Sequence, residues 1–146
     1  MSRELAKRKQ NRIPDYNYAA AGAYYITFCT RGRNCVLRDE KKNLTEEGRN
    51  ISEAIEAISE KYEYIRADRY IVMPDHVHVI LEIDSWENKV SIETVINQTK
   101  RRASLKSGYS LWQKGYYEHV VRDSDDYRRI CEYMENNPAR SNENTF

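Results

Sequence analysis

Residues 64–83, with the sequence YIRADRYIVMPDHVHVILEI, contain two runs rich in β-branched, aromatic and aliphatic side chains. Runs of this composition are typical of β-strands, so we expect strands over residues 64–73 and 76–83. Only Pro74 and Asp75 separate the two runs. Because so short a connection makes the chain reverse its direction, this stretch predicts an antiparallel hairpin.

On the N-terminal side of the hairpin, the sequence predicts one strand and one helix. The run over residues 24–30 is β-branched and aromatic and ends at Gly32, as a strand does. Thr45 is a suitable N-cap for a helix that begins with two glutamates near its positive end. The apolar face of this helix is formed by Ile51, Ile55, Ile58 and Tyr62, which recur at helical spacing.

On the C-terminal side, the sequence predicts a helix, a strand and a last helix. Ser91 caps the first helix, whose inward face holds Ile92, Val95, Ile96 and Thr99. Residues 116–121 form the strand. Asp123 or Ser124 caps the last helix, which ends at Asn137-Pro138 and has the core stripe Tyr127, Ile130, Cys131 and Met134.

The resulting order, β-α-β-β-α-β followed by one helix, predicts an α+β fold of the ferredoxin-like, split βαββαβ type. Such a fold has an antiparallel sheet with two helices on one face, and we expect the extra C-terminal helix to lie across the open face. The length of 146 residues suits a single domain, preceded by a basic arm over residues 1–15.

Composition and charge narrow the class of protein. The net charge is only +1, which is unlike a protein that coats DNA non-specifically. Residues 1–12 and 89–106 are rich in Lys and Arg, whereas residues 70–88 carry only acidic charges. This pattern suits an enzyme that holds phosphates at its edges and a cation at its centre, and ordinary solvated helix faces are the alternative. Three scattered cysteines and the lack of a long apolar run predict a reduced, cytoplasmic protein without a membrane partner.

His76 and His78 are candidate metal ligands. Side chains alternate along a strand, so these two histidines share one face with Ile80, while Val77, Val79 and the following apolar residues share the other. The apolar set is expected to face the helices, which places both imidazoles on the open face, about 7 Å apart along the backbone. That spacing allows both to bind one divalent ion, and two surface histidines are the alternative interpretation.

Tyr133 and Asn137 form a second constellation, on the last helix. They are four residues apart and therefore lie one above the other, on a flank outside the core stripe. This position is explained if Tyr133 points toward the open face and Asn137 offers its oxygen to the ion held by the histidines. A tyrosine that simply packs on the flank is the alternative.

These motifs together resemble those of the single-tyrosine HUH transposases, in particular the REP-associated tyrosine transposases and their IS200-like insertion-sequence relatives. The resemblance rests on YIVMPDHVH over residues 70–78 and YMENNP over residues 133–138, and it extends from about residue 10 to Arg140. Segments 14–16, 24–30 and 116–122 also match. Asn137 stands where some relatives carry Gln, although Asn is usual in the REP-associated group.

The resemblance implies an activity and its residues. In that family a Mg²⁺ or Mn²⁺ ion lies on two histidines, here His76 and His78, with a third ligand from the tyrosine helix, here Asn137. The tyrosine, here Tyr133, attacks single-stranded DNA and forms a 5′-phosphotyrosine bond. Relatives include dimers that combine residues of two chains and members that act as monomers, so the oligomeric state stays open.

Basic residues are candidates for DNA binding. Lys100, Arg101, Arg102 and Lys106 on the second helix are expected to contact phosphates of single-stranded or hairpin DNA, as are Arg8, Lys9 and Arg12 in the arm. His119 is expected to be an accessory or packed histidine, and Trp112 to belong to the core.

Three other functions compete with this one. A histidine-triad nucleotide hydrolase needs a further histidine where Ile80 stands, which excludes it. A non-enzymatic ferredoxin-like module that stacks bases on its sheet does not require His76, His78, Tyr133 and Asn137 to converge. A domesticated, non-catalytic protein that binds DNA hairpins and regulates is the remaining alternative.

Overall fold

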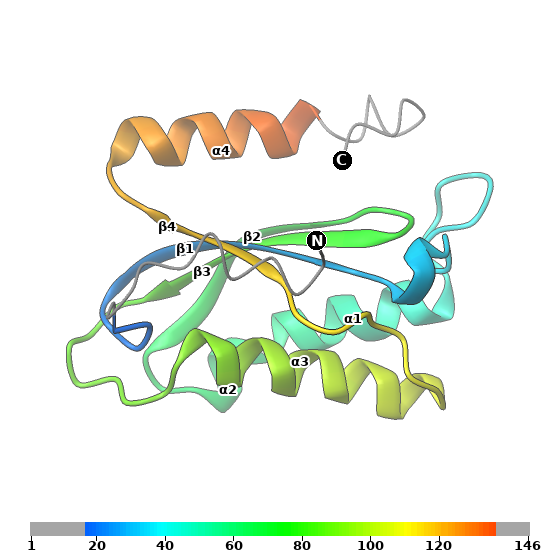
Figure 1. Cartoon of the computed structure of the whole chain (residues 1–146), viewed down its shortest axis with the longest axis horizontal. Helices are drawn as coiled ribbons and strands as arrows, with labels where there is room; N and C mark the ends of the chain where they lie inside the picture. The colour runs from blue at the N-terminus through cyan, green and yellow to red at the C-terminus, as the bar shows by residue number, and fades with distance from the viewer. Residues whose placement is uncertain (1–16, 137–146) are drawn as a thin grey trace.

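The computed structural model describes residues 17–136, and these residues form a four-stranded antiparallel sheet between two layers of helices (Figure 1). The strands are β1 (Gly22–Cys29), β2 (Ile65–Val72), β3 (His76–Ile83) and β4 (Tyr117–Val121), in the spatial order β2-β3-β1-β4. Each neighbouring pair is antiparallel. The predicted ferredoxin-like α+β fold is confirmed.

The helices divide between the two faces of the sheet (Figure 1). On one face lie α1 (Glu46–Glu56), the short α2 (Ile58–Lys61) and α3 (Ile92–Ser107), and on the other lies α4 (Ser124–Asn136). The side chains of Thr45 and Ser91 accept hydrogen bonds from the third residues of α1 and α3, as predicted for N-caps. The expected position of the last helix across the open face is also confirmed.

One helix differs from its prediction. The apolar spacing from Ile51 to Tyr62 predicted a single helical face, but α1 ends at Glu56 and the chain bends at Ala57 before α2. Tyr62 is in an extended conformation, although Ile51, Ile55 and Ile58 are buried as expected. The bend turns the chain toward β2, and alanine, a strong helix former, gives no sign of it in the sequence.

The alternation of side chains in β3 gives the sheet two different faces. Val77, Val79, Leu81 and Ile83 belong to the large core beneath α1 and α3. Ile80 points to the opposite face, where it packs with Tyr25 and with Ile130, Cys131 and Met134 of α4. The smaller cluster holds α4 on the sheet, on the face that also carries both histidines. Within residues 17–136, no helix is long and apolar enough to cross a membrane.

Candidate active site

The β2–β3 turn places two histidines at the start of β3. Met73 N donates to His76 O at 2.8 Å, which closes the turn around Pro74 and Asp75. In the register with β1, His76 lies opposite Cys29 and His78 opposite Thr27. The imidazole centroids of His76 and His78 are 4.8 Å apart, and both side chains are buried. The predicted sharing of one face by the two rings is therefore confirmed.

His78 is held by hydroxyl groups of β1. Its Nδ1 lies 2.9 Å from the Tyr25 hydroxyl and 3.0 Å from Thr27 Oγ1, and the Tyr25 ring stacks on the imidazole. Burial, with a smaller effect of neighbouring His76, lowers the pKa of His78 to about 3, so the ring stays neutral. A neutral imidazole has a lone pair to offer a metal, and the two hydroxyl groups at Nδ1 hold this ring in place.

His76 is held by a carboxylate that is itself held by an arginine. His76 Nδ1 lies 2.6 Å from Asp75 Oδ1, and Arg33 Nε donates to Asp75 Oδ2 at 3.0 Å. Burial acts to raise the pKa of Asp75, but the hydrogen bonds from His76 and Arg33 outweigh it and lower that pKa. The ionised carboxylate accepts a hydrogen bond from His76 Nδ1 and so orients the ring. Neither Asp75 nor Arg33 was predicted as a site residue, although an acid directly before the first histidine is a usable signal.

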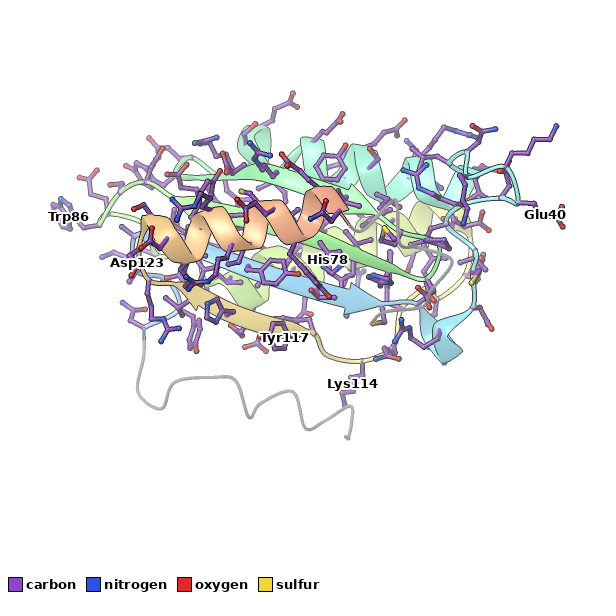
Figure 2. All side chains as sticks on the ribbon, turned by 90° about the horizontal axis from the view of Figure 1, so that it is seen from above. Glu40, His78, Trp86, Lys114, Tyr117 and Asp123 are labelled. Carbon is purple, nitrogen blue, oxygen red and sulfur yellow. The ribbon has the colours of Figure 1, made fainter. Side chains whose placement is uncertain are left out.

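Tyr133 faces this pair from α4. Its ring centroid is 6.3 Å from that of His78, and the residue is 36% exposed. The helix α4 passes over the face of the sheet that carries His78 (Figure 2). A cavity of about 380 Å³ opens between the sheet and this helix, and it is lined by Tyr25, Thr27, Phe28, Cys29, Arg33, His76, Tyr117 and Tyr133. Tyr133 and His76 thus line one cavity that opens to solvent, and the ring of His78 contacts the rings of both.

Tyr127, on the same helix, has different surroundings. Its hydroxyl donates to Asp68 Oδ2 at 2.5 Å, and the ring packs against the small cluster beneath α4. The hydrogen bond to Asp68, together with burial, raises the pKa of Tyr127 to about 12. This phenol therefore keeps its proton and serves the packing of α4, as its place on the core stripe predicted.

The donor set fits a divalent metal. The two imidazoles share one face of the sheet and both have their Nδ1 atoms held by neighbouring groups, which is how the histidine ligands of metal sites are oriented. Within the described part of the chain, no cluster of three His, Cys, Asp or Glu side chains is present that could hold a metal. A third ligand must be of another kind or come from elsewhere, and Asn137, the predicted one, lies outside the described residues.

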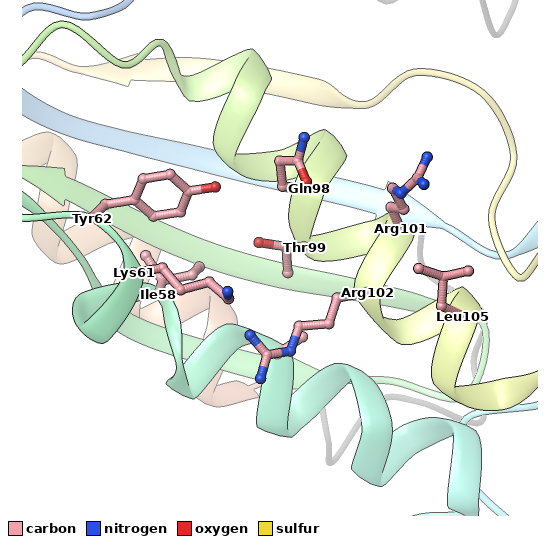
Figure 3. Close-up of a pocket in the computed structure, with 9 residues that line it drawn as sticks. Ile58, Lys61, Tyr62, Gln98, Thr99, Arg101, Arg102 and Leu105 are labelled. Carbon is pink, nitrogen blue, oxygen red and sulfur yellow. The ribbon is translucent and has the colours of Figure 1, made fainter.

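The basic residues of α3 do not form one surface. Arg101 and Arg102 are exposed, and with Lys61 they line a cavity of about 160 Å³ between α2 and α3 (Figure 3). Both helices lie on the sheet face opposite α4 (Figure 1). Lys106 forms an ion pair with Glu53 at 2.7 Å. Lys100 is buried, and its Nζ donates to the carbonyls of Gln113 at 3.1 Å and Gly115 at 2.9 Å.

Lys100 was predicted to contact DNA phosphates, but its buried ammonium group instead fixes the α3–β4 connection. Arg8, Lys9 and Arg12 lie outside the described residues. Trp112 is buried in the core, and the half-buried His119 pairs with Asp126 at 2.9 Å, so both have the packed positions expected of them.

The fold and the arrangement of the site residues indicate the class of protein, and comparison with known proteins shows the family to which the chain belongs. The ferredoxin-like fold, with paired histidines facing a helix-borne tyrosine, is the arrangement that the resemblance to single-tyrosine transposases implied. A family model described as "Transposase IS200 like" matches residues 19–137, and the chain belongs to this family.

Individual relatives agree with this assignment. An uncharacterized protein of Haemophilus influenzae is 28% identical over 160 aligned residues, covering 90% of this chain and 88% of that protein. A REP-associated tyrosine transposase of Escherichia coli is 27% identical over 73 residues, which cover 49% of this chain and 42% of that protein. A putative REP-associated tyrosine transposase of Haemophilus influenzae is 22% identical over 85% of this chain and 74% of its own length.

Two solved structures share the fold. One is a REP-associated tyrosine transposase bound to a REP hairpin, with a TM-score of 0.71 and 21% identity over 88% of this chain and 73% of that one. The other is a putative transposase from Deinococcus radiodurans, with a TM-score of 0.54 and 20% identity over 86% of this chain and 95% of that one.

Proposed function

We propose that this IS200-like transposase cleaves and rejoins single-stranded DNA at hairpin sites, through a 5′-phosphotyrosine intermediate formed on Tyr133. The observation that carries the proposal is the cavity lined by both Tyr133 and His76, together with the distance of 6.3 Å between the rings of Tyr133 and His78. A nucleophile and a candidate cation site on one cavity are the parts that phosphodiester cleavage requires. The REP-associated tyrosine transposase whose structure has been solved is bound to a REP hairpin, which supports a DNA hairpin as the substrate of this protein.

The reaction is a transesterification. The Tyr133 oxygen forms a bond to phosphorus, and the bond from phosphorus to the 3′ oxygen of the preceding nucleotide breaks. The phenol proton leaves to solvent and the departing oxygen gains a proton, so one strand ends in a free 3′-OH while the other is joined to the protein through its 5′ phosphate. Attack by a 3′-OH on this bond reverses the step and joins strands.

The chain's own residues prepare this step. Asp75 and the pair formed by Tyr25 and Thr27 hold the two imidazoles at Nδ1, and we propose that His76, His78 and Asn137 bind Mg²⁺ or Mn²⁺. A bound divalent ion stabilises the negative charge that develops on the phosphate and lowers the pKa of an oxygen close to it. The phenol needs this help because its ordinary pKa of about 10 leaves it protonated at neutral pH.

The test uses hairpin DNA with single-stranded flanks, taken from the flanks of the protein's own gene, with separate labels at its 5′ and 3′ ends. With Mn²⁺, the 3′ label should become bound to the protein and the 5′ label should be released on a fragment ending in 3′-OH. A chelator should prevent both. A domesticated, non-catalytic regulator binds the same DNA without forming an adduct, so binding without adduct would contradict the proposal.

A further inference from the structure

We propose that Arg33 is a further catalytic residue, whose guanidinium binds a non-bridging oxygen of the scissile phosphate. This inference rests on the proposed strand cleavage. It adds to the metal site a fixed positive charge from a turn that the sequence did not indicate.

The backbone at Arg33 is unusual. The turn Arg31–Arg33 follows β1, and Gly32 and Arg33 have φ angles of 64° and 56°. Glycine adopts this left-handed conformation freely, but an arginine with its Cβ does so at a cost. Outliers of this kind persist when surrounding contacts hold them, and they concentrate at functional sites.

The contacts that hold this turn come from the turn that carries His76. Arg33 N donates to Thr30 O at 3.0 Å, and Thr30 in turn donates to the carbonyl of Asp75 through its N–H at 3.0 Å and its hydroxyl at 3.2 Å. Arg33 Nε donates to the Asp75 carboxylate at 3.0 Å. Backbone and side chain therefore fix the guanidinium relative to His76.

The guanidinium lies where a substrate phosphate must enter. Arg33 lines the same cavity as His76 and Tyr133, and its side chain is 39% exposed. Of the described residues that line this cavity, Arg33 is the one whose side chain carries a permanent positive charge. The bond to Asp75 uses Nε, which leaves the N–H groups of Nη1 and Nη2 as separate donors, in the fork that matches two phosphate oxygens.

This charge suits the chemistry of the step. A phosphodiester carries one negative charge, and further charge develops on its non-bridging oxygens as the tyrosine oxygen attacks. Donors fixed before the reaction stabilise that charge without reorganisation. Arg33 differs in this respect from a flexible surface arginine, because its backbone and its Nε are both held.

A positioning role is the competing explanation. In that case Arg33 acts only on Asp75, Asp75 acts only on His76, and loss of Arg33 weakens metal binding. Arg31 provides a matched control in the same turn, because it is exposed and its Nη2 donates to Ser110 Oγ at 2.7 Å, away from the cavity.

The experiment compares the full-length Arg33→Gln, Arg33→Lys, Arg31→Gln and Asp75→Asn variants by two measurements, after thermal unfolding has shown that each is folded. One is the affinity for Mn²⁺ alone by calorimetry, and the other is the single-turnover rate of adduct formation at saturating Mn²⁺ and DNA. We expect Arg33→Gln to lower the rate roughly 10²- to 10³-fold and to keep the Mn²⁺ affinity. Arg33→Lys should restore part of the rate, and Arg31→Gln should match the wild type in both measurements.

Asp75→Asn removes the carboxylate that holds His76, and so it gives the effect expected of a residue that acts only through this histidine. We expect it to weaken Mn²⁺ binding about 10- to 100-fold. A loss of Mn²⁺ affinity in Arg33→Gln, with the wild-type rate restored at saturating Mn²⁺, would overturn direct contact in favour of positioning. A wild-type rate together with an unchanged Mn²⁺ affinity in Arg33→Gln would overturn both roles and leave the proposed function standing. If the wild-type protein forms no adduct, the proposed function fails and this inference fails with it.

A modified substrate supplies an independent check. Replacing one non-bridging oxygen of the scissile phosphate by methyl gives two methylphosphonate diastereomers, and one of them lacks the oxygen that Arg33 binds. The ratio of wild-type to Arg33→Gln rates should fall toward unity for that diastereomer. A ratio equal to that for the natural phosphate in both diastereomers would contradict direct contact.

Discussion

Tyr133 and Tyr127 lie on the same helix, but only one of them is placed for chemistry. The Tyr127 hydroxyl donates a hydrogen bond to Asp68 and has a pKa of about 12, whereas Tyr133 lines the cavity and its ring lies near that of His78. Tyr133→Phe removes one oxygen and hardly any volume, so we expect it to abolish the covalent adduct while DNA binding and stability stay near the wild-type values. Adduct formation and hairpin affinity, measured on the same preparation, check this.

Tyr127→Phe is the control for that substitution. It should retain the adduct and lower the free energy of unfolding by about 1 kcal/mol, because the hydrogen bond to Asp68 is lost. Strand cleavage by Tyr133→Phe at the wild-type rate would contradict the assignment of the nucleophile.

Individual residues also show which parts of the site could be predicted from the sequence and which could not. Alternation along β3 was enough to place His76 and His78 on one face, because the period of a strand is fixed. The contact from Arg33 to Asp75 joins positions 42 residues apart, and no local pattern predicts it. Lys100 follows a helical charge pattern in the sequence, but the α3–β4 connection passes over its ammonium group and buries it.

At the scale of elements, α3 carries charges with different functions. We expect the double substitution Arg101→Ala/Arg102→Ala to weaken DNA binding and to reduce the slope of log affinity against log salt by roughly two, because each phosphate contact releases about one counterion. The rate of cleavage at saturating DNA should not change, since these residues lie on the sheet face opposite the histidines. Titrations at several salt concentrations measure the slope.

Lys100→Met provides the contrast within the same helix. It should leave the salt slope unchanged and lower the free energy of unfolding by about 1–3 kcal/mol, because the carbonyls of Gln113 and Gly115 lose their charged donor. An unchanged slope in the double Arg variant would assign Arg101 and Arg102 to ordinary solvated surface.

A buried carboxylate adds to the apolar contacts that attach α4 to the sheet. Asp126 accepts hydrogen bonds from Arg122 N at 3.0 Å and from His119 at 2.9 Å, and so ties the first turn of the helix to the end of β4. We expect Asp126→Ala to lower the free energy of unfolding by about 1.5–3 kcal/mol. Chemical denaturation of the full chain measures this.

Asp125→Ala is the matched control, one residue away. Asp125 is exposed and pairs with the equally exposed Arg128, so its loss should cost less than about 1 kcal/mol. Equal effects of the two substitutions would show that Asp126 does not anchor the helix.

At the scale of the whole molecule, one face of the sheet carries the large apolar core and the other carries the candidate active site. The large apolar core fills the space beneath α1 and α3, whereas the histidines, Arg33 and Tyr133 gather on the other face. Most of this architecture follows from the sequence, because periodic apolar spacing, two N-caps and a two-residue hairpin connection specify the elements and their order. The bend at Ala57 and the turn at Arg33 do not follow from it, since tertiary contacts rather than local preference hold those conformations.

The central claim is that one tyrosine among twelve becomes bonded to DNA, and peptide mapping of the adduct tests it most directly. Cleavage after Arg129 and Arg140 yields the peptide ICEYMENNPAR, in which Tyr133 is the single tyrosine, and Tyr127 falls in a different peptide. After reaction with hairpin DNA and Mn²⁺, we expect a nucleotide attached through its 5′ phosphate to this peptide. A nucleotide on any other tyrosine-containing peptide would contradict the claim.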